Sequence, residues 1–299
     1  MKMSRTQLFG DGFSLMMRCG PMWLVALAVA AVDMLLSRVL PTAGLTGTIL
    51  TTLRSALTGA FLTSALIVLT NAVAEKQPTT FGGGFAAGAR FYPTLLAIDL
   101  ILAVPALVFG QLVTLFLAPL ANQLPQTPDA ANLQKLVSTL GVMLCVLLPL
   151  LLLAFLLVAA ITSAIGLGAE RAVALEGANV WRGFKRGWDL LTEKLGDMFV
   201  IGLMMLGIVI VFFIFFGCAA GIVFVGANLL TLGATSAISK LSSNVVFNIL
   251  TTLVMIPIQI WFSVIWTLAF RRWQGKDTLQ PLPIPQPQPQ PPAEPPAGG

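Results

Sequence analysis

Three ionisable side chains of this chain fall inside or beside long apolar runs, where a charge meets few polar partners. Asp33 lies in the outer half of the first run, Arg54 at the outer edge of the second, and Asp99 about two turns into the third. Charges within a bilayer are costly, so they either pair with one another or mark a path for protons or ions. We expect an Asp33–Arg54 ion pair near the outer interface, with a relay through Asp33 as the alternative. Asp99 is expected to face polar groups at the inner surface.

The residue types that most catalytic and metal sites need are scarce. The sequence has no histidine, and its three cysteines (Cys19, Cys145 and Cys218) are far apart, with no CxxC pair. This excludes histidine-dependent catalysis, histidine–metal ligation and paired-cysteine zinc sites. A free cysteine on an apolar helix most often packs as a small hydrophobic residue. We therefore expect a protein that is not an enzyme and holds no metal ion or cofactor.

The composition is that of a chain whose solvent is lipid. Hydrophobic residues make up 57% of the 299 positions and charged residues only 10%, whereas a soluble domain carries about 25% charged residues. The net charge is +5, but the charges lie in short segments between uncharged runs, as membrane loops do. Nothing in this distribution favours nucleic-acid binding.

Six apolar runs are long enough to cross a bilayer as helices, for which about 20 residues suffice. They cover residues 21–40, 55–74, 93–117, 137–168, 199–225 and 244–270. We therefore predict an all-α transmembrane domain over residues 1–272, in which six helices form three pairs. The stretch 226–239 is too short to span and is predicted to be a surface loop or a re-entrant piece. The Pro/Gln-rich segment 273–299 is predicted to be a disordered cytoplasmic tail.

The basic residues indicate the orientation. Of the 17 Lys and Arg residues, all except Arg38, Arg54, Lys135 and Lys240 fall on the side of the predicted bundle that holds both termini. Loops rich in Lys and Arg stay in the cytoplasm. Both termini are therefore predicted to be cytoplasmic.

A weak threefold repeat runs through the chain. Gly12-Phe13 is followed by Arg18 and Pro21, and Gly84-Phe85 by Arg90 and Pro93, at the same offsets. A third copy, Gly183-Phe184, has Asp189 and Thr192 in place of the Arg and Pro. Each copy precedes one pair of predicted spans, so each pair is expected to begin with a cytoplasmic amphipathic segment.

The third copy carries an apolar stripe at helical spacing. Its members are Trp181, Phe184, Trp188, Leu191 and Leu195. Three cations accompany it: Arg182, Lys185 and Arg186. In the first copy, Phe9, Phe13 and Met16 form a shorter stripe. A helix of this kind either caps the bundle or lies in the membrane interface, with its tryptophans at headgroup depth and its cations near anionic phosphates.

Small residues at four-residue spacing allow close helix packing. Ala160, Ala164 and Gly168 form one such series, and Gly217 and Gly221 another. We expect them to pack within the bundle, with a dimer seam as the alternative.

The layout resembles a loose group of bacterial inner-membrane proteins. The features that carry the resemblance are the Gly-Phe segments, the three helix pairs and the sequence Trp-Arg-Gly-Phe-Lys-Arg-Gly-Trp-Asp-Leu-Leu at 181–191, ahead of the fifth span. The group comprises uncharacterised six-helix proteins (UPF0259-like) and the related membrane domain fused to some glycerophosphodiester phosphodiesterases. The resemblance covers residues 1–272 and implies six helices in the bacterial inner membrane. Without histidine or clustered carboxylates, phosphodiesterase activity is not expected here.

Three functional hypotheses follow. The first is a membrane-organising or lipid-interacting protein that uses the residues around Trp181 and Trp188. The second is a small-solute transporter or an accessory subunit of one, using Asp33 and helices kinked at prolines such as Pro257. The third is a scaffold subunit bound to an unidentified membrane protein partner.

Overall fold

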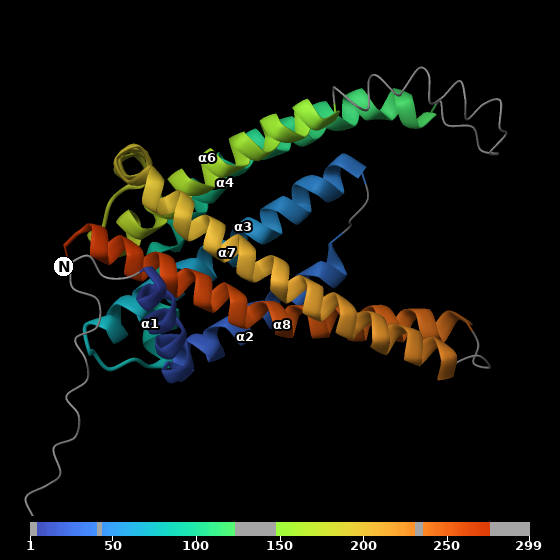
Figure 1. Ribbon diagram of the computed structural model, residues 1–299, viewed down its shortest axis with the longest axis horizontal. Helices are drawn as coiled ribbons and strands as arrows, with labels where there is room; N and C mark the ends of the chain where they lie inside the picture. Colours follow the sequence, from blue (N-terminus) through green and yellow to red (C-terminus); the bar gives the residue numbers. More distant parts are fainter. Residues whose placement is uncertain (1–4, 41–43, 123–147, 231–235, 276–299) are drawn as a thin grey trace, which may run out of the picture.

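The computed structural model describes residues 5–40, 44–122, 148–230 and 236–275. Every regular element in these ranges is an α-helix (Figure 1). The helices are α1 (Arg5–Arg18), α2 (Gly20–Val39), α3 (Gly44–Ala74), α4 (Phe81–Asn122), α6 (Leu148–Glu176), α7 (Val180–Leu230) and α8 (Ser236–Trp273). All but α1 are long and apolar enough to cross a membrane, which gives 6 candidate spans. The prediction of an all-α polytopic membrane protein is confirmed.

Several boundaries differ from those expected. The amphipathic segment before the third span is not a separate element, because α4 is one helix from Phe81 onward. In α7 the corresponding segment is set off from the span by a non-helical residue, Lys194, with φ −121° and ψ 17°. Helix α6 continues to Glu176, past the expected end at residue 168, and residues 137–147 of the predicted fourth span lie outside the described ranges.

Two predictions near the end of the chain need correction. The loop expected at 226–239 is wrong where the structure describes it, because α7 continues to Leu230 and α8 already begins at Ser236. The tail expected from residue 273 is wrong for the first residues of that range. Trp273 is the last residue of α8, and the Gln274 side-chain amide donates a hydrogen bond to Glu176. The remainder of the predicted tail, from residue 276, lies outside the described residues.

The last helix of each repeat (α3, α6 and α8) is followed by a residue with a positive φ angle. Lys76 follows α3 with φ 57°, Gly177 follows α6 with φ 66°, and Gly275 follows α8 with φ 74°. These three are the positive-φ positions found in the described part of the chain. A left-handed residue just after a helix lets the next backbone N–H groups turn back onto the last free carbonyls. After α3, the N–H groups of Lys76 and Gln77 donate to Val73 and Ala72 at 3.0 and 2.8 Å.

The glycine of each Gly-Phe pair is the point at which an amphipathic segment packs on another helix. All three glycines are buried. A Cβ placed on Gly12 would lie 3.0 Å from a side chain of α8, one on Gly84 2.7 Å from α3, and one on Gly183 3.2 Å from α6. The second and third segments therefore pack on the last helix of the preceding repeat. The first segment packs on α8, the last helix of the third repeat. Each segment therefore packs on the last helix of the repeat before it, if the third repeat is taken to precede the first.

The second and third segments also begin alike. The Thr80 hydroxyl accepts a hydrogen bond from the backbone N–H of Gly83 at 3.0 Å. The Asn179 side-chain oxygen accepts one from Arg182 at 2.9 Å. Both are N-caps, which satisfy one of the free N–H groups in the first turn of a helix. Each cap stands four residues before the glycine of its Gly-Phe pair, so the structure supports the repeat inferred from sequence.

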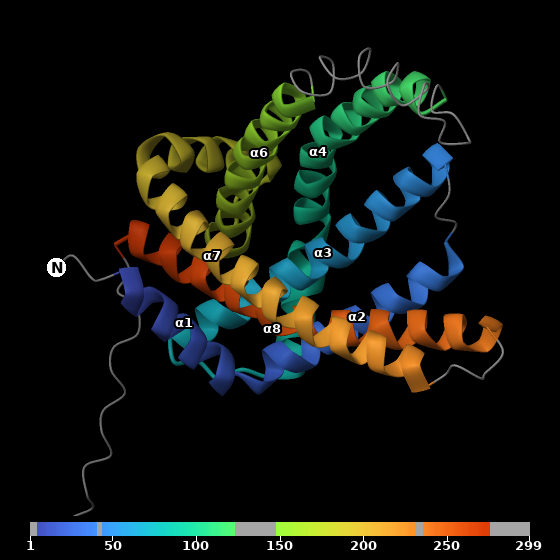
Figure 2. The ribbon, with the colours of Figure 1, turned by 45° about the vertical axis from the view of Figure 1, so that its right-hand side comes forward.

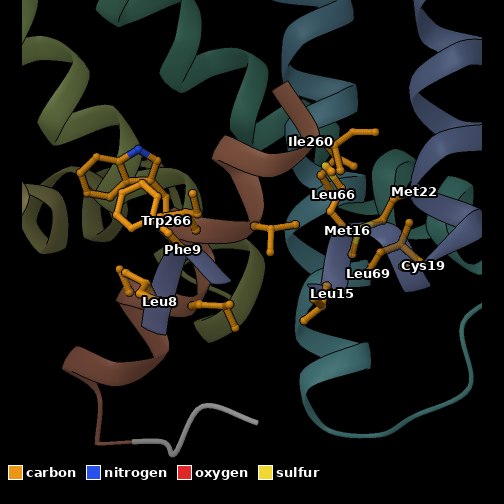
Figure 3. Close-up of a cluster of buried hydrophobic side chains, with 14 of the residues drawn as sticks. Leu8, Phe9, Leu15, Met16, Cys19, Met22, Leu66, Leu69, Ile260 and Trp266 are labelled. Atoms are coloured by element: carbon orange, nitrogen blue, oxygen red, sulfur yellow. The ribbon is translucent and has the colours of Figure 1, made fainter. Parts of the chain in front are cut away.

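The main core lies where α1 meets the spans. Figure 3 shows Leu8, Phe9, Leu15 and Met16 of α1 in a cluster with Leu66 and Leu69 of α3 and Ile260 and Trp266 of α8. We call this end of the molecule, at which α3, α6 and α8 end, the basic end. Away from it the spans diverge: Figures 1 and 2 show the α4–α6 pair separating from α7 and α8. Large apolar side chains such as Leu153, Leu115 and Phe215 are exposed there, as expected of surfaces that face lipid.

Candidate functional site

Residues 180–195 at the start of α7, which we call the interface segment, pack one face on α6. Gly183, Gly187 and Leu190 are buried on this face. The backbones come very close, because a Cβ on Gly187 would lie 2.3 Å from the carbonyl oxygen of Ile165. In Figure 2 the segment runs across the neighbouring helices before the chain turns into the span. The segment is therefore anchored to α6 through its glycines.

The opposite face of the interface segment is open. Trp181 is 82% exposed, Trp188 54% and Leu195 58%. Arg182 and Lys185 are exposed beside them. Two of the predicted interface residues behave differently. Phe184 packs against a cluster between α4 and α6, and the Nε of Arg186 lies 3.6 Å from Glu176. Four of the six predicted residues thus share an exposed surface, and two face the protein.

The other two copies of the repeat leave less of their aromatic surface open, although Phe81 and Phe85 of the second copy are 41% and 46% exposed. In α1, Phe9 is 8% exposed and Met16 3%. Phe13 is half exposed, but its ring meets that of Trp261 edge-on, with the centroids 5.9 Å apart. In the second copy, Phe85 meets Phe61 at 4.8 Å. The α1 segment therefore caps the bundle, and the interface segment of α7 differs from it.

Asp33 and Arg54 are paired, as their places in the sequence led us to expect. The Nε of Arg54 lies 3.4 Å from Oδ1 of Asp33, and the Thr58 hydroxyl donates to the same oxygen at 3.1 Å. The Arg54 side chain is 18% exposed and that of Asp33 37%. Asp33 lies on α2, and its two partners lie one turn apart on α3. The pair therefore connects the first two spans.

Asp33 also borders a cavity of about 320 Å³ between α2, α3 and α8. Its polar lining comes from Asp33, Ser55, Thr58, Thr251, Thr252 and Gln259. Its apolar lining comes from Ala26, Val29, Ala30, Gly59, Leu62, Met255 and Ile256. Ser55 and Gln259 are exposed, so the cavity is open to its surroundings. Sequence reasoning found Asp33 but missed the α8 residues, because nothing local relates them to the first two helices.

Asp99 lies on α4 and does not join Asp33. It is half-buried, and the acidic residue Glu170 lies on α6, which packs against α4. The neighbouring Arg171 is buried; its guanidinium contacts Glu170 at 3.2 Å and donates to the Leu167 carbonyl at 2.9 Å. From sequence, Arg171 was expected beyond the end of the fourth span at residue 168, but it lies within α6. Gly177, a typical residue just after a helix end, was the signal that α6 continues past Arg171.

A polar network ties the basic end together. The buried guanidinium of Arg271 on α8 donates to the Asn71 side chain and, at 2.9 Å, to Glu75, both on α3. Gln274 donates to Glu176, which also pairs with Arg186. The acceptors Glu75 and Glu176 each directly precede a positive-φ residue, as does Gln274. These contacts hold the ends of the three repeats in register. From sequence, Arg271 indicated only the orientation, and Arg186 was expected at the membrane interface.

Within the described ranges, no group of three or more His, Cys, Asp or Glu residues could hold a metal ion. The six apolar helices and the basic end define a polytopic α-helical membrane protein. The family described as a domain of unknown function (DUF7847) matches residues 3–272, so the chain belongs to that family. No curated protein and no solved structure matches it.

Proposed function

We propose that this is a non-enzymatic protein of the bacterial inner membrane that interacts with anionic lipid headgroups through its interface segment. One observation carries the proposal: Trp181, Trp188 and Leu195 are exposed beside Arg182 and Lys185. In the corresponding stripe on α1, Phe9 and Met16 are buried, and Phe13 packs one side of its ring against Trp261. Tryptophan favours the headgroup level of a bilayer, where its ring is half in apolar surroundings and its N–H meets water.

The geometry suits a helix that lies along the membrane surface. It begins at the Asn179 cap, crosses α6, and meets the span at Lys194, where the backbone leaves helical geometry. An apolar stripe on such a helix can enter the headgroup region while exposed cations reach lipid phosphates. The positive-inside rule and the family resemblance support cytoplasmic termini and a location in the inner membrane. The basic end then faces the cytoplasm.

The test compares two pairs of charge-neutralising substitutions in the full-length protein. Arg182→Gln with Lys185→Gln removes the two exposed cations of the interface segment. Arg18→Gln with Arg90→Gln removes two exposed cations elsewhere at the basic end and serves as the matched control. Arg186 is left in place because it pairs with Glu176. Retention of phosphatidylglycerol relative to phosphatidylcholine is then titrated by native mass spectrometry.

Each cation near an anionic surface contributes about 1 kcal/mol. The first pair should therefore weaken phosphatidylglycerol binding about tenfold or more, and the control pair less than twofold. An equal loss in both pairs would show that only net charge matters, and it would contradict a specific role for the interface segment.

A second candidate function is small-solute transport, and the polar cavity beside Asp33 is the observation that favours it. A polar cavity between spans is what a solute pathway needs, and one of its walls carries Pro257 within α8. Proline cannot donate the backbone hydrogen bond that the carbonyl of Leu253 would accept in a regular helix. Interrupted helices of this kind border binding sites in many transporters.

A further inference from the structure

Polar side chains from three spans face one cavity. Asp33, Thr58, Thr252 and Gln259 all lie within segments long and apolar enough to cross the membrane, and all line the same space of about 320 Å³. Gln259 is exposed and Asp33 is only half-buried. Leaving such groups against hydrocarbon costs several kcal/mol each, on the order of 2–7. Water or a polar ligand must therefore occupy the cavity.

The negative charge of Asp33 in the cavity lining favours a ligand with a positive charge. Among the described residues that border the cavity, Asp33 is the one that ionises. Its ion pair with Arg54 measures 3.4 Å, longer than the 2.7–2.9 Å or so of a tight charge-assisted hydrogen bond. The contacts of this carboxylate with Arg54 and Thr58 both use Oδ1. A carboxylate offers two oxygens and about four lone-pair directions, so it retains the capacity to accept further hydrogen bonds.

The volume of the cavity and the residues of its walls further restrict the class of ligand that fits. The volume corresponds to about ten water molecules at roughly 30 Å³ each, which is far more than an inorganic ion needs. The lining carries the hydroxyl groups of Ser55, Thr58, Thr251 and Thr252 as well as the apolar side chains of Val29, Leu62 and Ile256. A ligand with a cationic donor group and a short apolar body matches both parts.

We propose that this cavity binds a small organic cation with an ammonium group, which Asp33 and the neighbouring hydroxyls accept. This inference deepens the second candidate function, since it names the ligand class of the same cavity. It does not depend on the interface segment, because none of the cations of that segment lines the cavity. The inference also concerns binding rather than transport, so an experiment can contradict transport without contradicting ligand binding.

The test uses the full-length protein in nanodiscs and propylammonium chloride as the probe. Binding is followed by saturation-transfer difference NMR of the probe. 1-Propanol, of similar size but uncharged, and sodium chloride serve as competitors. Asp33→Asn removes the charge. Gly59→Leu fills the cavity and leaves Asp33, Arg54 and Thr58 unchanged; a Cβ on Gly59 meets nothing within 4 Å, so the variant is expected to fold.

Gly202→Leu is the matched control. Gly202 lies on α7, does not line the cavity, and likewise has open space around its Cβ. We expect saturable propylammonium binding to the wild type and the Gly202 variant, and binding at least tenfold weaker in both Asp33→Asn and Gly59→Leu. Unchanged binding in Gly59→Leu, or equal competition by 1-propanol, would overturn the proposal. Equal competition by sodium at the same concentration would assign the site to an inorganic cation instead, and would also overturn it. If purified wild-type protein transports no solute yet binds the probe, the second candidate function fails and this inference stands.

Discussion

Gly168 of α6 and Gly187 of α7 meet backbone to backbone. A Cβ on Gly168 would lie 2.7 Å from the Cα of Gly187, a separation that real Cβ atoms do not reach. The interface segment approaches α6 to a distance that only glycine permits at both positions. In lipid the hydrophobic effect does not drive helices together, so close backbone packing of this kind supplies the attraction. The position of the segment against α6 therefore depends on this glycine pair.

Gly187→Ala should destabilise the protein. The new Cβ would approach the Ile165 carbonyl oxygen to 2.3 Å, and because backbone cannot yield as a side chain can, we expect a loss of about 1–3 kcal/mol in the free energy of unfolding. Gly202→Ala is the control, because its Cβ would meet nothing within 4 Å. That change should be neutral or stabilising by up to about 1 kcal/mol from helix propensity. Unfolding in SDS titrations measures both, and equal effects would contradict the packing argument.

Part of this crossing was predictable. Ala164 and Gly168 belong to a series of small residues on α6, and the spacing correctly predicted packing within the bundle at Gly168. Gly183 and Gly187 have the same four-residue spacing, a signal of close packing that we did not use. We interpreted the glycines of the segment as part of a repeat. Their packing role depends on which helix lies opposite, and periodicity within one segment does not contain that information.

Lys76→Gly should stabilise the protein. Lys76 occupies the left-handed position that Gly177 and Gly275 occupy in the other two repeats, at φ 57°. A residue with a Cβ is strained there by about 1–2 kcal/mol, and part of this gain is offset by the greater freedom of glycine in the unfolded chain. We expect a net gain of about 0.5–1 kcal/mol. The reciprocal change, Gly177→Ala, should cost about 1 kcal/mol, and thermal unfolding of the two variants in one detergent compares them directly.

Arg271→Met should weaken the connection between α8 and α3. It removes hydrogen bonds from a buried guanidinium to Asn71 and Glu75. Glu75 is about one-third exposed and can be rehydrated, so we expect a loss of about 1–3 kcal/mol rather than the larger cost of a fully buried unpaired charge. Arg18→Met, at an exposed cation, should change stability by less than about 0.5 kcal/mol. If Glu75→Gln costs as much in the Arg271→Met background as in wild type, the two residues are not coupled.

In the candidate sites, too, contacts between neighbouring helices were predictable from the sequence, and contacts between distant segments were not. The Asp33–Arg54 pair was predictable, because both charges were expected at the same level of consecutive spans and unpaired charges in a bilayer are costly. The cavity was not, because Thr251, Thr252 and Gln259 come from a helix some 200 positions later in the sequence. The interface segment was predictable as an amphipathic helix. The stripes of α1 and α7 look alike in sequence, and only their packing shows that α8 covers the first and leaves the second open.

Trp188 and Trp266 allow this last distinction to be measured. Trp266 is 8% exposed in the core around α1, α3 and α8, whereas Trp188 is 54% exposed on the interface segment. Trp266→Ala should therefore cost about 3–5 kcal/mol of unfolding free energy, as truncation of a large core side chain does. Trp188→Ala should cost less than about 1 kcal/mol in detergent, because the residue has little protein packing to lose. In bilayers with bromine-labelled lipids, Trp188→Ala should also remove a component of tryptophan fluorescence that shallow bromines quench more than deep ones. A large loss of stability from Trp188→Ala in detergent would mean that protein covers this stripe, and the headgroup assignment would then fail.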